Sequence, residues 1–147
     1  MKPFKKYIEE SVERLSEFYG YWQPSSNVKV TDGMILRPYK GGIHKKVEQI
    51  FEDERPISAP SRMEYFFVAP TSTHHLFKSN KPIYEVLVTG KALFANAELF
   101  TEAVFSRDDE SIRDYAREYW KGTKDKNNKY TEIVVDKKGK VEVLWEI

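Results

Sequence analysis

Residues 129–147 read KYTEIVVDKKGKVEVLWEI, and they form the most informative segment of the chain. Two runs rich in strand-forming residues, 131–136 and 141–147, flank a polar link that contains Gly139. Strand-forming runs on either side of a short, glycine-containing link are typical of two paired antiparallel strands. The segment therefore predicts a β-hairpin.

Glu132 leads directly into the apolar run Ile133-Val134-Val135. A carboxylate in this position is held by a rigid strand but lies at its mouth, where a ligand can reach it. Because most charged residues are simply exposed, the competing interpretation is a solvated carboxylate at the edge of a strand. Both interpretations of Glu132 stay open at this point.

The composition is that of an ordinary globular domain. The chain has 147 residues, of which 40% are hydrophobic and 32% charged, which suits a single domain with a real core. Its 24 basic and 23 acidic residues give a net charge of +1, so the charge balance does not favour a nucleic-acid partner. Cysteine is absent, which excludes a disulfide framework, thiol catalysis and zinc bound through cysteine.

Neither a membrane span nor a metal site is predicted. No apolar run approaches the roughly 20 residues that cross a bilayer, and the basic residues 1–6 lead into an amphipathic pattern that is no signal peptide. We therefore expect a cytoplasmic protein without membrane contact. The histidines are His44, His74 and His75. Adjacent residues on an extended chain point to opposite faces, so the last two are poor joint metal ligands.

Apolar residues recur about every 3.6 positions from residue 5 to about residue 22, which predicts an amphipathic N-terminal helix within residues 1–24. Gly20 and the polar residues after it are expected to end this helix. A second helix is predicted at 43–54, with Glu48 on the side that points away from the core. Its buried face is expected to comprise Ile43, Val47, Ile50 and Phe51.

Further helices are predicted at 96–105 and 108–121. Asn96 is expected to cap the first, and Ser106 with Asp108, Asp109 and Glu110 is expected to supply the cap and the first-turn acids of the second. Strands are predicted at 34–39, 63–69 and 82–90, where β-branched and aromatic residues are concentrated. The order of elements is then α-β-α-β-β-α-α-β-β. This order indicates an α+β fold in one domain that spans the whole chain.

Polar residues stand at the beginnings and ends of the predicted strands. Arg37 lies in an apolar strand, while Ser61 and Arg62 precede an aromatic one. Alone, Arg37 fits an exposed or ion-paired residue, and Arg62 fits a clamp on backbone carbonyls. Together with Glu132, they suit a dinucleotide whose C–N glycosidic bond is broken. Arginine can bind a pyrophosphate through paired hydrogen bonds, and a carboxylate can stabilise the positive charge that develops on the ribose.

This arrangement resembles the ADP-ribosyltransferase superfamily. Residues 131–144 resemble its last motif, in which a catalytic glutamate opens a strand that is followed by a short loop and another strand. Residues 60–68 resemble the middle motif, a strand bearing Ser, Thr or Tyr that floors the nicotinamide pocket. Residues 33–38 resemble the first motif, where an arginine or histidine contacts NAD, and residues 116–122 are similar to small bacterial and phage members.

The resemblance implies an NAD-dependent mono-ADP-ribosyltransferase. Its core, residues 28–147, would be a split, twisted antiparallel β-sheet with flanking helices, and NAD would bind as a substrate between the halves. Glu132 would be catalytic, holding the ribose while nicotinamide leaves. A nucleophile on an unidentified acceptor, which is a protein, a nucleic acid or a small molecule, would then attack. Members that modify arginine usually carry Glu or Gln two residues before the catalytic acid, where this chain has Tyr130.

The resemblance also assigns residues that bind NAD. Arg37 or Arg62 would hold the pyrophosphate, Tyr65 would stack on the nicotinamide, and either Ser61 or Tyr65 would fill the role of the middle motif. The main alternative is a non-catalytic interaction or inhibitor protein, for example one encoded by a phage, that binds a host protein. A dry, buried cleft lined by Arg37, Arg62 and Glu132 would favour the enzyme. A filled cleft, with an exposed aromatic patch from Phe4, Tyr7 and Tyr19, would favour the interaction protein.

Overall fold

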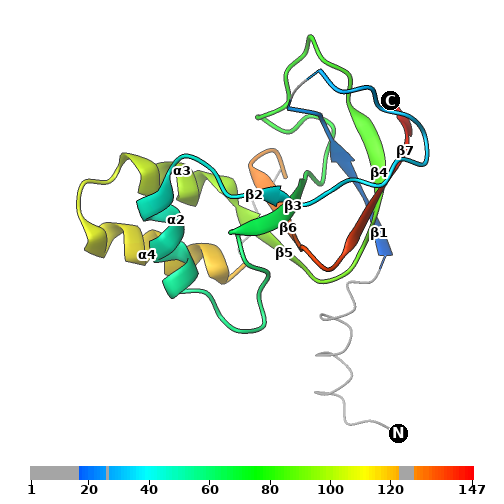
Figure 1. Cartoon of the computed structure of the whole chain (residues 1–147). Coiled ribbons are helices and arrows are strands. Elements are labelled where there is room, and N and C mark those ends of the chain that lie inside the picture. Colours follow the sequence, from blue (N-terminus) through cyan, green and yellow to red (C-terminus); the bar gives the residue numbers. More distant parts are fainter. Residues whose placement is uncertain (1–16, 26, 123–127) are drawn as a thin grey trace, which may run out of the picture.

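The computed structural model describes residues 17–25, 27–122 and 128–147. Within this part, the protein is α+β, with two antiparallel sheets and three helices (Figure 1). Sheet A has the strand order β1-β4-β7, formed by Glu17–Trp22, Tyr84–Thr89 and Lys140–Glu146. Sheet B has the order β2-β3-β6-β5, formed by Tyr39–Lys40, Glu64–Val68, Thr131–Asp136 and Ala92–Asn96. The helices are α2, Lys45–Asp53; α3, Ala97–Phe105; and α4, Asp109–Trp120.

The predictions of these three helices, and of the strands that form β3 and β4, are confirmed. The expected buried face of the helix predicted at 43–54 is wrong at Ile43, which precedes α2 and is 88% exposed. Helix α3 begins where Oδ1 of Asn96 accepts the amide of Glu98 at 2.9 Å. Helix α4 begins where Oδ1 of Asp108 accepts the amide of Ser111 at 2.8 Å. Both side chains satisfy amides that the start of a helix leaves without an intrahelical acceptor. No helix in the described residues is long and apolar enough to cross a bilayer.

Sheet B lies between the three helices and sheet A (Figure 1). Successive residues of a strand point to opposite faces of its sheet. In β6, Glu132 and Val134 therefore face the helices, whereas Ile133 and Val135 face sheet A. Strand β6 is paired on both edges and buried on both faces, so it is the central strand of the fold.

The predicted N-terminal helix is wrong at residues 17–22, which form β1 and pair with β4 along their whole length. This stretch is rich in aromatic residues, which favour strands, and β4 supplies a partner that local periodicity does not reveal. Gly20 is a position of close packing and not the end of a helix. A Cβ atom there would lie 2.3 Å from Cγ1 of Val68 in sheet B. Residues 5–16 of the predicted helix lie outside the described residues.

The two strands at the end of the sequence form as predicted, but the predicted hairpin is wrong because they do not pair with each other. Strand β6 pairs with β3 and β5, and β7 pairs with β4. The short link between β6 and β7 therefore carries the chain from sheet B to sheet A. Gly139 in this link packs so closely on Gly90 that a Cβ atom on Gly90 would lie 2.8 Å from its Cα.

The strand predicted at 34–39 is divided between the two sheets. Residues 33–36 run beside β7, where the amide of Leu36 donates to the carbonyl of Val141 at 2.9 Å. The chain then crosses to sheet B, where the short strand β2 pairs with β3. Arg37 lies at this crossing, between the part bonded to sheet A and the part bonded to sheet B.

Candidate functional site

A cavity of about 600 Å³ lies beside the beginning of β6. Four of the five residues that the sequence assigned to a site line it, namely Arg37, Arg62, Tyr65 and Glu132. These residues come from the crossing segment, the beginning of β3 and the beginning of β6. Much of the remaining wall is aromatic or aliphatic and includes Trp22, Leu36, Phe66, Phe67, Leu76 and Phe100.

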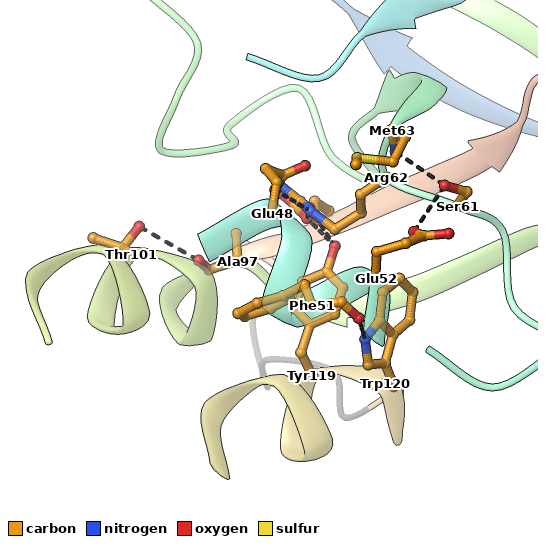
Figure 2. Close-up of polar contacts among 11 residues, drawn as sticks. Glu48, Phe51, Glu52, Ser61, Arg62, Met63, Ala97, Thr101, Tyr119 and Trp120 are labelled. Atoms are coloured by element: carbon orange, nitrogen blue, oxygen red, sulfur yellow. Dashed lines mark hydrogen bonds and ion pairs between the residues drawn. The ribbon is translucent and has the colours of Figure 1, made fainter. Parts of the chain in front are cut away.

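A buried polar cluster adjoins this cavity and is centred on Arg62 (Figure 2). Nε of Arg62 donates to Oε1 of Glu48 on α2 at 2.9 Å, and Nη1 donates to the hydroxyl of Tyr119 on α4 at 2.6 Å. Arg62 also pairs with the carboxylate of Glu132, to which the Tyr119 hydroxyl donates as well. We call these four residues, Glu48, Arg62, Tyr119 and Glu132, the Arg62 cluster. None of them exposes more than 5% of its surface.

The electrostatics of the Arg62 cluster keep its central guanidinium charged. Burial opposes that charge, but the oxygens of Tyr119 and Glu132 outweigh the effect and hold the pKa of Arg62 well above its ordinary value. Burial raises the pKa of the Glu48 carboxyl, an effect that Arg62 partly offsets. Burial also raises the pKa values of Tyr65 and Tyr119, so both phenols stay protonated at neutral pH. Arg62 is therefore a permanent cation that fixes the Glu132 carboxylate.

The structure places the other predicted residues in different surroundings. Arg37 is exposed at the cavity wall, whereas the guanidinium of Arg62 is enclosed by its partners. Tyr65 is buried and lines the cavity. Ser61 is not part of the cavity wall, since its hydroxyl donates to Oε2 of Glu52 at 2.8 Å. Arg37 is thus the better placed of the two arginines for an incoming anion, and Ser61 shapes the chain before β3.

Two members of the Arg62 cluster were not recognised as site residues. The prediction that Glu48 points away from the core is wrong, because it is buried together with Val47 and Phe51. A signal was available, since residues three and four apart share a face of a helix and Glu48 precedes Phe51 by three positions. Tyr119 lies in the helix predicted at 108–121, and its position in the sequence gives no sign that its hydroxyl would meet Glu132.

Two adjacent histidines border the site. His74 is buried, and its Nδ1 accepts the amide of Leu76 at 3.2 Å. Burial lowers the pKa of His74 to about 4, so it is neutral at neutral pH. His75 lines the cavity and donates from its backbone amide and Nδ1 to the carbonyl of Lys129, at 3.0 and 3.1 Å. No group of three or more acidic or histidine side chains in the described residues is arranged to hold a metal ion.

The fold and the site together define an α+β protein in which an aromatic-walled cavity adjoins a buried carboxylate–guanidinium cluster. Residues 6–147 match the family described as "Protein of unknown function (DUF2441)", and the chain belongs to this family. Comparison with curated proteins finds no match.

Proposed function

We propose that the protein is an NAD-dependent mono-ADP-ribosyltransferase, which cleaves the bond between nicotinamide and ribose and transfers ADP-ribose to an acceptor. The observation that carries this proposal is the shared cavity of Arg37, Arg62, Tyr65 and Glu132. These residues are far apart in the sequence and meet only in the folded chain. The cavity volume of about 600 Å³ falls within the range of about 300–1,000 Å³ that is usual for small-molecule sites.

The arrangement of the sheets also supports the proposal. The resemblance implied a split antiparallel core with NAD between its halves, and the described strands form two antiparallel sheets. The cavity takes part of its wall from Trp22 of sheet A and part from Tyr65 of sheet B. The cavity is lined by Arg37, Arg62 and Glu132, which is the feature expected of the enzyme. Tyr19 is 65% exposed, which is a feature that the non-catalytic interaction protein would share.

In the proposed reaction, the C–N bond between ribose and nicotinamide breaks, and its electron pair leaves with nicotinamide. Positive charge develops on the ribose, where the Glu132 carboxylate accepts a hydrogen bond from a hydroxyl and stabilises that charge. A nucleophile on the acceptor then bonds to the anomeric carbon and loses its proton. Arg62 and Tyr119 act as positioning residues, because both hold the Glu132 carboxylate.

Two further residues would orient NAD. Arg37 is exposed at the cavity wall, where its planar guanidinium can make paired hydrogen bonds to a pyrophosphate. Tyr65 presents a buried aromatic ring that suits stacking against nicotinamide. Burial raises the pKa of Tyr65, so its ring stays neutral beside the positively charged nicotinamide. Glu132 would then bind the nicotinamide ribose, and Arg37 would bind the pyrophosphate attached to it.

The proposal is tested with the Glu132→Gln variant, which keeps the size of the side chain and removes its charge. We expect NAD to bind to both proteins in calorimetry, and the release of nicotinamide to fall by roughly a hundredfold or more in the variant. Nicotinamide is measured by mass spectrometry after incubation with NAD. The matched control is Glu102→Gln, an exposed position on α3 outside the cavity, which should leave the release unchanged.

Two outcomes would contradict the proposal. If the wild type neither binds NAD nor releases nicotinamide, the protein is not an enzyme of this class. If Glu132→Gln releases nicotinamide at the wild-type rate, the Glu132 carboxylate is not catalytic. Thermal unfolding of each variant checks that a lost activity does not come from a lost fold.

A further inference from the structure

His75 lines the larger cavity, and the chain just before β6 holds it in place. Its backbone amide and its ring Nδ1 both meet the carbonyl oxygen of Lys129, at 3.0 and 3.1 Å. Its ring also packs against the ring of Tyr130, with the two centroids 4.6 Å apart. The amide of Ala97, where α3 begins, donates to the carbonyl of Tyr130 at 2.8 Å. The imidazole is therefore anchored to a segment that is itself bonded to α3.

These contacts decide which nitrogen of His75 is able to act as a base. A carbonyl oxygen only accepts hydrogen bonds, so the contact with Lys129 places the proton of a neutral ring on Nδ1. Nε2 then carries the free lone pair. Among the described residues Nε2 has no hydrogen-bond partner, and it is not one of their enclosed unpartnered atoms. His75 thus presents an accessible proton acceptor.

His75 and Glu132 both line the larger cavity, beside the beginning of β6. Tyr130, on which the ring of His75 packs, precedes Glu132 by two residues, and two residues of extended chain span at most about 7 Å. Inverting glycosidases, in which a base activates the nucleophile, keep their two catalytic groups roughly 6.5–9.5 Å apart, which leaves room for that nucleophile. The anchoring of His75 beside Tyr130 suits a separation of this order.

We propose that His75 is the catalytic base of the transfer step and that its Nε2 removes the proton of an acceptor hydroxyl group or of water. This inference rests on the proposed function. The C–N bond to nicotinamide breaks with its electron pair leaving on nicotinamide, and the acceptor oxygen bonds to the anomeric carbon of the ribose. The O–H bond breaks, its electron pair stays on the oxygen, and the proton passes to Nε2 and then to solvent.

The surroundings of His75 favour this role. An imidazole is the side chain best suited to take up and release a proton near neutral pH. The ring of His74 lies beside that of His75, with the centroids 4.7 Å apart, and His74 is neutral at neutral pH. It therefore does not repel the positive charge that His75 gains with the proton.

The base is tested by a competition between azide and water for the ribose. Azide is an anion without a proton to lose, so it needs no base, whereas water does. The full chain and the His75→Gln variant are incubated with NAD and sodium azide, and mass spectrometry gives the ratio of ADP-ribosyl azide to ADP-ribose. We expect this ratio to rise at least about tenfold in the variant, because general base catalysis contributes roughly 100- to 10,000-fold.

Two variants serve as controls in the azide competition. His44→Gln replaces an exposed histidine outside the larger cavity and should keep the wild-type ratio. Glu132→Gln should slow both products together, because the carboxylate acts on the ribose whichever nucleophile bonds to it. A variant of His75 that merely distorted the cavity would likewise slow both products and leave their ratio unchanged.

A measurement on the wild type alone covers the case in which His75→Gln does not fold. In D₂O the capture of water should slow, because a base breaks its O–D bond as the oxygen bonds to the ribose. Azide loses no proton, so the ratio of ADP-ribosyl azide to ADP-ribose should be higher in D₂O than in H₂O.

The failure of the base and the failure of the proposed function are distinguishable. A wild type that releases no nicotinamide overturns the transferase and, with it, the role of His75. If nicotinamide is released but the product ratio is the same in the wild type and His75→Gln, the transferase stands and the base is overturned. An equal ratio in D₂O and H₂O overturns the base in the same way.

Discussion

The two faces of sheet B are buried by different kinds of contact. The face toward sheet A meets a mostly aliphatic core, in which Ile133 and Val135 of β6 pack among valines of β4 and β7. The face toward the helices meets aromatic rings and the Arg62 cluster, where two carboxylates share one guanidinium. Neighbouring residues of one strand, Glu132 and Ile133, thus belong to opposite environments.

This contrast separates what stabilises the fold from what serves a site. Burial of aliphatic surface is non-directional and contributes roughly in proportion to area. A buried ion pair depends on all its partners, so the removal of one partner is destabilising. Replacing the whole pair by well-packed apolar residues is often neutral or even stabilising. The Arg62 cluster is therefore a costly way to fill space, and its position beside the cavity supports a role in function.

Arg62→Ala should cause the largest loss of stability of any single change discussed here. It leaves the carboxylates of Glu48 and Glu132 buried without their shared cation, and breaking a buried pair in this way costs about 3–5 kcal/mol. Urea denaturation measures the change. The control is Arg117→Ala, which removes an exposed arginine paired with Glu54 and should barely move the midpoint.

The comparison is sharpened by replacing all three charged members together. Because an apolar substitute for a whole ion cluster is often tolerated, a variant with Met at positions 48, 62 and 132 should recover much of the stability lost in Arg62→Ala. The same variant should release no nicotinamide from NAD. If Arg62→Ala is as stable as Arg117→Ala, the cluster does not hold the helices on sheet B, and the contrast between the faces disappears.

The elements of the fold were more predictable than their pairing. Helices α3 and α4 follow from local signals, apolar periodicity and the capping side chains of Asn96 and Asp108, which act within a few residues. Strand β1 does not follow from local signals. Its apolar residues fit a helical period in the sequence, and they form a strand because β4 is available as a partner. The hairpin prediction was wrong for the same reason. A glycine-containing link indicates that the chain reverses, but it does not indicate which strands pair with β6 and β7.

The residue types of the candidate site were predictable from the sequence, but the hydrogen bonds and ion pairs between them were not. Arg37, Tyr65 and Glu132 were selected for chemistry that suits NAD, and the fold brings them to one cavity. The partners of Arg62 could not be foreseen, because Glu48 and Tyr119 come from two helices that are distant in the sequence. Such contacts depend on how α2 and α4 pack on sheet B, which no local pattern encodes.

His74 should produce the next largest effect, as a dependence of stability on pH. Its pKa is lowered to about 4 by burial, below the ordinary value of 6.5, so the unfolded chain binds more protons between these values. The contribution of His74 to the free energy of unfolding is complete above about pH 6.5 and is lost as the pH falls toward 4. At about 1.4 kcal/mol per pKa unit, it amounts to on the order of 3 kcal/mol.

The measurement compares urea denaturation at pH 7 and pH 4.5 for the wild type and His74→Gln. The variant should lose less stability on acidification, because a glutamine does not titrate and its amide oxygen can still accept the Leu76 amide. His44→Gln is the control, since this exposed histidine is not among the groups that act on His74, and it should keep the pH dependence of the wild type. Equal losses in the wild type and His74→Gln would show that His74 is not a buried neutral base.

Ile133→Val should have the smallest effect, and it probes the aliphatic face directly. Ile133 is fully buried in the core toward sheet A, and removal of one methylene group there costs about 0.5–1.5 kcal/mol. Its side chain points away from the Arg62 cluster, so the release of nicotinamide should not change. Urea denaturation and the nicotinamide assay on the same preparation test both expectations. A slower release with this small loss of stability would show that packing on the aliphatic face controls the position of Glu132, and the two faces would then not be independent.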